Sequence, residues 1–105
     1  MPDHALILIT VGDKEEANSI ARRLVEERLV AGVQIIPIDS VYSWQNEIVE
    51  DGEFLLIAKT RKDRFSAVQS AVEDLHSYEV PPIVRIDIEQ ANQPYLDWID
   101  GVLGV

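Results

Sequence analysis

Two short segments of the chain are continuously apolar. Residues 5–11 read Ala-Leu-Ile-Leu-Ile-Thr-Val and end at Gly12, and residues 54–58 read Phe-Leu-Leu-Ile-Ala. Short apolar runs of this kind are typical of strands that are buried on both faces. We therefore expect residues 5–11 and 54–60 to form the central strands of one sheet.

Two other segments carry apolar residues at helical spacing. The first follows Asp13, which precedes Glu16 as in a helix N-terminal capping box, and it should end near residues 28–30. Thr60 and Asp63 can cap the second helix. The apolar faces consist of Ala17, Ile20, Ala21 and Leu24 in the first helix, and of Phe65, Val68, Ala71, Val72 and Leu75 in the second.

A long hairpin is predicted between these helices. Residues 32–44 have extended character, but Pro37 needs a bulge or an edge position because it cannot donate a hydrogen bond to a neighbouring strand. Gln45 and Asn46 offer a tight turn, since asparagine tolerates a positive φ. The return strand reaches residue 60, and we expect a bulge or another irregularity in its acidic part, residues 50–53.

The C-terminal part of the chain completes the pattern. Residues 76–82 form a connection, because Pro81 and Pro82 cannot lie inside a helix. Alternation over residues 83–89 predicts a half-exposed strand, and Pro94 marks the start of a short C-terminal helix. The predicted fold is α+β: a ferredoxin-like βαββαβ sandwich with a short C-terminal helix.

One face of this sheet lacks a cover. Right-handed crossovers place both long helices on the same face. The central strands nevertheless carry bulky apolar side chains on both faces, from sets such as Leu6, Leu8, Leu55 and Ile57. If about four of them stay in water, about 6–12 kcal/mol of hydrophobic stabilisation is lost, which is comparable to the free energy of unfolding of a whole domain. We therefore expect a partner subunit, in an oligomer of any symmetry that covers this face.

Composition narrows the classes of partner. The 105 residues are 47% apolar and 27% charged, which is typical of a single globular domain spanning residues 1–105. The formal net charge is −10, from 19 acidic and 9 basic residues. Such a field repels phosphate backbones and anionic lipid, so we expect no nucleic-acid or membrane partner. It favours metal cations and basic partners.

Cysteine usage and the N-terminus bear on location. The chain contains no cysteine, which removes disulfides, thiolate metal sites and cysteine nucleophiles, and which is compatible with a reducing compartment. Residues 1–11 lack the basic start and the small-residue cleavage site of a signal peptide. We expect a cytoplasmic protein.

Catalytic motifs are absent from the sequence. It contains no G-x-S-x-G, no H-E-x-x-H, no P-loop and no glycine-rich dinucleotide loop. A small hydrolase of the acylphosphatase type would need a phosphate-binding loop after the first strand, and residues 12–15, Gly-Asp-Lys-Glu, are too acidic for that role. We expect a protein that is not an enzyme.

Four motifs in sequence order resemble the CutA divalent-cation-tolerance family. Residues 42–48, Tyr-Ser-Trp-Gln-Asn-Glu-Ile, resemble the family's Y-x-W-x-G-x-I hairpin, and residues 59–61, Lys-Thr-Arg, its K-T strand end. Residues 76–81, His-Ser-Tyr-Glu-Val-Pro, resemble its H-P-Y-E-V-P loop, and residues 95–98, Tyr-Leu-Asp-Trp, its Y-L-x-W segment. Order and spacing agree along nearly the whole chain.

The resemblance implies an assembly and a function. It implies a homotrimer with its sheets packed inward, a hairpin that reaches a neighbouring subunit, an architecture similar to that of PII signalling proteins, and a link to copper and other divalent cations. Three positions depart from the family pattern. Gly32 and Ile9 stand where some members have cysteine, and Ser77 replaces a proline. A soft thiolate site for Cu(I) is therefore unavailable here.

His76 and Glu79 are the candidate metal ligands. An imidazole suits Cu(II), zinc and nickel, and a nearby carboxylate can complete a nitrogen and oxygen ligand set. The two residues lie three positions apart across a helix end, so both can face one cleft, and two ligands per chain make a weak site. In the alternative interpretation, His76 bonds to a carbonyl at the helix end and Glu79 pairs with a basic residue.

Other polar and aromatic groups have more ordinary interpretations. Tyr42 and Trp44 lie on one face of the hairpin and favour interface packing over a ligand cleft between subunits. His4 should be solvated. The acidic set Glu47, Glu50, Asp51 and Glu53 favours a solvated surface over a hard-cation site, and the basic set Lys59, Arg61, Lys62 and Arg64 favours ion pairs over an anion site at the second helix.

The sequence leads to two hypotheses about function. The first is a trimeric protein of divalent-cation (copper) tolerance that binds Cu(II) or another divalent cation weakly near His76 and Glu79. The alternative is a PII-like signalling or scaffold trimer whose intersubunit cleft binds a small molecule or a partner protein. The first requires saturable metal binding that depends on His76, and the second a ligand whose binding is independent of metal.

Overall fold

The computed structural model describes residues 2–105, which form a four-stranded sheet with three α-helices. Within these residues, no helix combines the length and the apolar composition that crossing a membrane requires. In chain order the elements are β1 (His4–Val11), α1 (Lys14–Glu26), β2 (Gly32–Trp44), β3 (Glu47–Arg61), a single 3-10 turn (Lys62–Arg64), α2 (Phe65–Leu75), β4 (Ile83–Asp87) and α3 (Gln93–Leu103).

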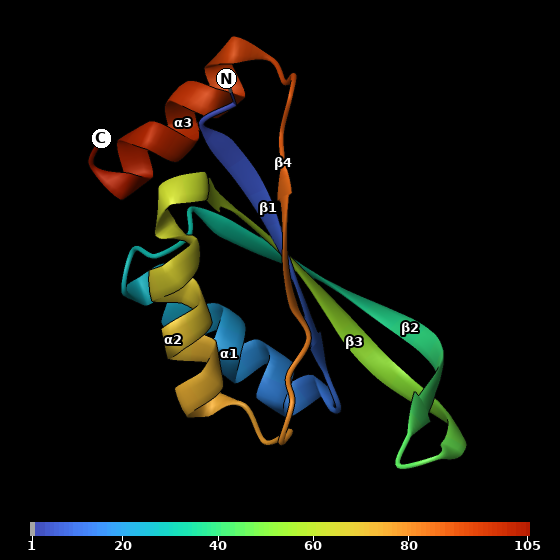
Figure 1. The fold of residues 1–105 in the computed structure, drawn as a ribbon. Helices are drawn as coiled ribbons and strands as arrows, with labels where there is room; N and C mark the ends of the chain where they lie inside the picture. The colour runs from blue at the N-terminus through green and yellow to red at the C-terminus, as the bar shows by residue number, and fades with distance from the viewer. Residues whose placement is uncertain (1) are drawn as a thin grey trace.

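The sheet is antiparallel, with the strand order β2-β3-β1-β4 (Figure 1). The central strands are β1 and β3, as their continuous apolar runs predict, and the predicted α+β class and βαββαβ order with a C-terminal helix are confirmed. Apolar side chains from one face of these strands meet the apolar faces of α1 and α2 in a single core. The other face of the sheet receives neither of these helices.

Burial along β1 and β3 alternates between the two faces. On the helix side, Ile7, Ile9, Leu56 and Ala58 are 0% exposed. On the opposite side Leu6, Leu8, Leu55 and Ile57 are only half-buried, as the sequence predicts for an uncovered face. The flanking strands extend this apolar surface, which we call the open face, with Ile36, Val84 and Ile86, at 42%, 51% and 46% exposed.

The two helix starts differ from each other. The carboxylate of Asp13 accepts a hydrogen bond from the Glu16 N–H at 2.8 Å, which confirms the predicted cap of α1. The predicted cap of α2 is wrong: Thr60 is still in β3, and its buried hydroxyl donates to the Leu29 carbonyl at 2.7 Å. The 3-10 turn separates the strand from α2, which starts after Arg64 without a side-chain cap.

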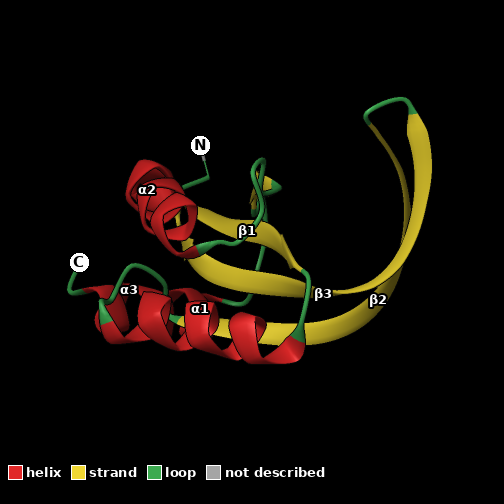
Figure 2. Cartoon of the chain, turned by 90° about the horizontal axis from the view of Figure 1, so that it is seen from below, coloured by secondary structure: helices red, strands yellow, loops and turns green. Residues whose placement is uncertain are grey.

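The β2–β3 hairpin is longer and more regular than the sequence suggests. Its register runs without interruption from Gly32 opposite Lys59 to Trp44 opposite Glu47, so the bulge expected over residues 50–53 is wrong. Pro37 is accommodated because β2 is an edge strand, which the sequence offered as the other solution. Both turn residues, Gln45 and Asn46, have positive φ angles of 51° and 66°, the pattern of a type I′ turn. Figure 2 shows the hairpin curving away from the helices.

Helix α3 is attached to the sheet by polar and apolar contacts. Its buried residues Ile99 and Leu103 pack against Ala31. Asp100 accepts hydrogen bonds from His4 Nε2 at 2.8 Å and from the Arg61 guanidinium at 2.9 Å. His4 is 9% exposed, so the expected solvated position is wrong, because α3 folds back over the N-terminal end of β1.

Candidate functional site

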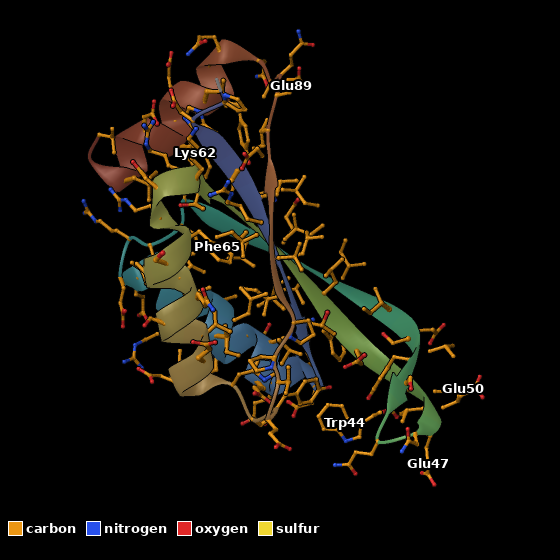
Figure 3. The ribbon with its side chains drawn as sticks, in the orientation of Figure 1. Trp44, Glu47, Glu50, Lys62, Phe65 and Glu89 are labelled. Atoms are coloured by element: carbon orange, nitrogen blue, oxygen red, sulfur yellow. The ribbon has the colours of Figure 1, made fainter. Side chains whose placement is uncertain are left out.

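A cleft of about 800 Å³ lies between the hairpin and the connection that follows α2. The side chain of Trp44 points from the hairpin toward this connection, whereas Glu47 and Glu50 point away from it (Figure 3). A volume of this size suits a small-molecule ligand. The lining residues are Thr10, Asp39, Ser40, Val41, Tyr42, Trp44, Glu53, Ser77, Tyr78, Glu79, Val80 and Pro82.

The side chain of His76 is fully buried and lies beneath this cleft. Its Nε2 lies 2.7 Å from the Thr10 carbonyl oxygen, and its Nδ1 lies 3.0 Å from the backbone nitrogen of Tyr78. A carbonyl can only accept and an N–H can only donate, so both contacts are satisfied when Nε2 carries the ring proton and Nδ1 accepts. Both ring nitrogens therefore hold the connection after α2 against the end of β1.

Glu16 fastens the same connection from α1. Its two carboxylate oxygens accept hydrogen bonds from the Ser77 N–H at 2.7 Å and from the Ser77 hydroxyl at 2.8 Å. The carboxylate also lies 3.7 Å from Nδ1 of His76. The sequence assigned Glu16 only to the capping box of α1, and no local pattern predicts a partner 61 residues away.

Replacing Glu16 with alanine should therefore loosen the connection. We expect a loss of about 1–2 kcal/mol of stability, because a charged acceptor of two hydrogen bonds is removed. Amide hydrogen exchange at Ser77 should accelerate. The matched control is Glu15→Ala, since Glu15 is in the same first turn of α1 but exposed. Equal effects of the two substitutions on Ser77 exchange would contradict this role.

Glu53 and Tyr78 form the base of the cleft. The Tyr78 hydroxyl donates to Glu53 at 2.5 Å, and Glu53 is only 5% exposed. Burial, followed by this hydrogen bond, raises the pKa of Tyr78, so the phenol stays protonated and keeps donating. Gly12 makes room for the ring, since a Cβ there would lie 2.9 Å from the Tyr78 oxygen. The fully solvated acidic surface predicted for Glu47, Glu50, Asp51 and Glu53 is thus wrong at Glu53, whereas the other three residues are exposed.

The structure separates the two predicted metal ligands. Glu79 is exposed and lines the cleft, whereas His76 lies behind it with both ring nitrogens bonded to the backbone. The carboxylate within 4 Å of the His76 ring is that of Glu16. Across residues 2–105, no group of three or more potential ligands is gathered closely enough to hold a metal ion.

Several of the remaining candidates line the cleft or have polar partners. The two hairpin aromatics, Tyr42 and Trp44, are partly exposed and form one wall of the cleft. Arg61 is paired with Asp100, as the ion-pair interpretation predicts. Arg64 donates to the carbonyls of Arg28 and Leu103, both at 3.1 Å, and Lys59 donates to Gln34.

Comparison with known proteins relates the chain to one family. Residues 5–102 match the family model described as CutA1 divalent ion tolerance protein. The divalent-cation tolerance protein CutA of Thermus thermophilus is 48% identical over 95 residues, covering 90% of this chain and 92% of its own length. The protein of the same name from Archaeoglobus fulgidus is 44% identical over 97 residues, covering 92% of this chain and 95% of its own length.

A solved structure agrees with the fold described above. It is that of the Archaeoglobus fulgidus protein, described as a periplasmic divalent cation tolerance protein CutA. It superposes with a TM-score of 0.93 at 43% identity, over 95% of this chain and 98% of the other. Both the sheet with its long hairpin and the three helices are therefore shared with a known structure.

Proposed function

The chain belongs to the CutA1 divalent ion tolerance family, and on this premise we propose that it acts as a homotrimer in divalent-cation (copper) tolerance and binds divalent metal ions weakly. The observation that carries the proposal is the family match over residues 5–102, together with relatives whose names specify divalent-cation tolerance. We propose a binding role without enzymatic activity, and a cytoplasmic location, for this chain.

The open face supports the assembly. Four half-buried residues on the central strands and three exposed ones on the flanking strands form a continuous apolar surface on one side of a single chain. Lys59 is at the end of this surface, and burial already lowers the pKa of its ammonium group. Apolar surfaces of this extent are characteristic of protein interfaces. Three copies packed through their sheets would remove it from water.

The proposed metal site uses His76 and Glu79. Among divalent ions of the first transition row, copper binds nitrogen and oxygen ligands most strongly, so Cu(II) is the first candidate. A metal at Nδ1 of His76 must displace the hydrogen bond from the Tyr78 N–H, and this competition makes the site weak. The formal charge of −10 raises the local concentration of cations and works in the opposite direction.

Calorimetric titration with Cu(II) tests this site. Removal of one of two protein ligands should abolish most of the saturable binding, so we expect His76→Ala and Glu79→Gln each to lose it. Glu50→Gln is the matched control for Glu79→Gln, because it removes the same charge from an exposed position outside the cleft. Circular dichroism should show that His76→Ala is folded. Unchanged copper affinity in that folded variant would end the assignment.

A second candidate function is a PII-like signalling or scaffold trimer. The observation in its favour is the cleft itself, whose volume of about 800 Å³ and aromatic wall suit an organic ligand better than a single ion. In the proposed trimer the hairpin reaches a neighbouring subunit, so this cleft lies at or near an interface. Ligand binding that persists in the presence of a metal chelator would favour this function over metal binding.

A further inference from the structure

The charge of the cleft is unbalanced. Three carboxylates line it, those of Asp39, Glu53 and Glu79, and no lysine, arginine or histidine is among the described residues that do so. Asp51 is nearby, because its carboxylate lies 3.5 Å from the Tyr42 hydroxyl. Outside the cleft, Asp100 and Asp87 each pair with an arginine. The cleft therefore has a negative field without an internal counter-ion.

Glu53 is the most buried of these carboxylates. Only 5% of its surface is exposed. Burial of a carboxylate costs free energy unless the group is paired. One oxygen accepts the Tyr78 hydroxyl, and within residues 2–105 the other oxygen accepts no hydrogen bond. The raised pKa of Tyr78 keeps its hydroxyl as the donor in this hydrogen bond. One oxygen of a largely buried carboxylate is thus free to bind a cationic group in the cleft.

The walls of the cleft indicate the kind of cation. Tyr42, Trp44 and Tyr78 supply aromatic surface, and Val41, Val80 and Pro82 supply aliphatic surface. Aromatic faces attract organic ammonium groups, and apolar walls contact methylene groups. A bare metal ion gains nothing from such walls and needs several ligands at one point, whereas no such group is found across residues 2–105.

We propose that the cleft between the hairpin and the connection after α2 binds an aliphatic diamine or polyamine. Its ammonium groups pair with Glu53 and with the rim carboxylates Asp39 and Glu79, and its methylene chain lies against the aromatic wall. This inference rests on the second candidate function, in which the cleft is a ligand site. It gives that ligand a chemical class, and it does not require a metal ion at His76.

The test is calorimetric titration of the native assembly with putrescine, a diamine, at physiological ionic strength. We expect saturable binding of putrescine and none of butanediol, its neutral analogue of equal chain length. Mg²⁺ has the same charge as putrescine without the hydrocarbon, so it should compete poorly. Equal binding of butanediol, or full displacement by equimolar Mg²⁺, would overturn the proposal. Absence of saturable putrescine binding would also overturn it.

Two matched variants distinguish binding in the cleft from general attraction of putrescine by the negative charge of the protein. Glu53→Gln keeps an oxygen that accepts the Tyr78 hydroxyl, and it should weaken putrescine binding by about tenfold or more. Glu50→Gln removes the same charge from an exposed position of the same strand, and should change the affinity less than about twofold. Equal effects of the two variants would reveal diffuse attraction and refute the site.

A further variant, Asp39→Asn, tests the amine site without disturbing the fold or the proposed metal ligands. Asp39 is exposed, so Asp39→Asn cannot disturb the core. It should weaken putrescine binding and leave Cu(II) binding at His76 unchanged. Unchanged putrescine affinity in Asp39→Asn would overturn the amine site, and a loss of Cu(II) binding in the same variant would overturn the metal site.

Discussion

Replacing Ile57 with glutamate should dissociate the native assembly into single chains. Ile57 is half-buried in the middle of the open face, opposite Leu8 on β1. In a trimer packed through this face the new carboxylate would be taken out of water without a partner, which costs several kcal/mol. In a single chain it can still reach solvent, so each subunit should remain folded. Sedimentation equilibrium should then give the mass of one chain.

The control for this experiment is Val25→Glu. Val25 is also apolar and exposed, but it is on α1, which packs against the opposite face of the sheet. This variant should keep the mass of the native assembly. A smaller effect is expected for Trp44→Ala on the hairpin, where lost packing should weaken assembly without abolishing it. A native-sized assembly of Ile57→Glu would contradict packing through the open face.

Replacing Asp100 with alanine should detach α3 from the sheet. The substitution leaves His4 and Arg61 without their common acceptor, and both side chains are mostly buried. Because Asp100 itself is partly exposed, we expect a loss of about 2 kcal/mol, below the range for a fully buried pair. Denaturant titrations at equal protein concentration measure this difference. Asp97→Ala is the matched control, since Asp97 is exposed and bonds only to Gln93 in the same helix.

The same contact predicts a dependence on pH. Burial opposes ionisation of Asp100, but hydrogen bonds from His4 and Arg61 outweigh it and lower the pKa of the carboxyl group. A carboxyl whose pKa is lower in the folded state stabilises the fold above its unfolded-state pKa, and this stabilisation is lost as the pH falls through the folded-state value. The wild type and Asp100→Ala should therefore converge in stability in acid. A constant difference between them would contradict this role of Asp100.

Local sequence patterns predicted the elements of this fold but few of the contacts between them. Alternation and apolar runs identified the central strands, and the cap of α1 depends on two residues that are three positions apart. Positive φ angles at Gln45 and Asn46 also follow from the residue types of a tight turn. The prediction of a bulge over residues 50–53 was wrong, because a run of charged side chains does not interrupt the backbone hydrogen bonds between two strands that both continue past it.

The cleft depends on contacts that no local pattern encodes. Glu53 looked like one member of an acidic surface, but it is buried and its hydrogen-bond partner Tyr78 is 25 residues further along the chain. His4 looked like a solvated terminal residue, and its partner Asp100 is 96 residues away. His76 and Glu79 were predicted to share a cleft from their spacing, but the spacing does not reveal that backbone groups bond to both ring nitrogens of His76.

Anomalous diffraction from crystals soaked in a copper(II) salt tests the proposed role in cation binding most directly. The proposal predicts one anomalous peak for each subunit, in contact with the imidazole of His76 and the carboxylate of Glu79. The Tyr78 N–H should then have lost its bond to Nδ1. Peaks confined to other residues, or a copper-soaked crystal without a peak at this loop, would contradict it.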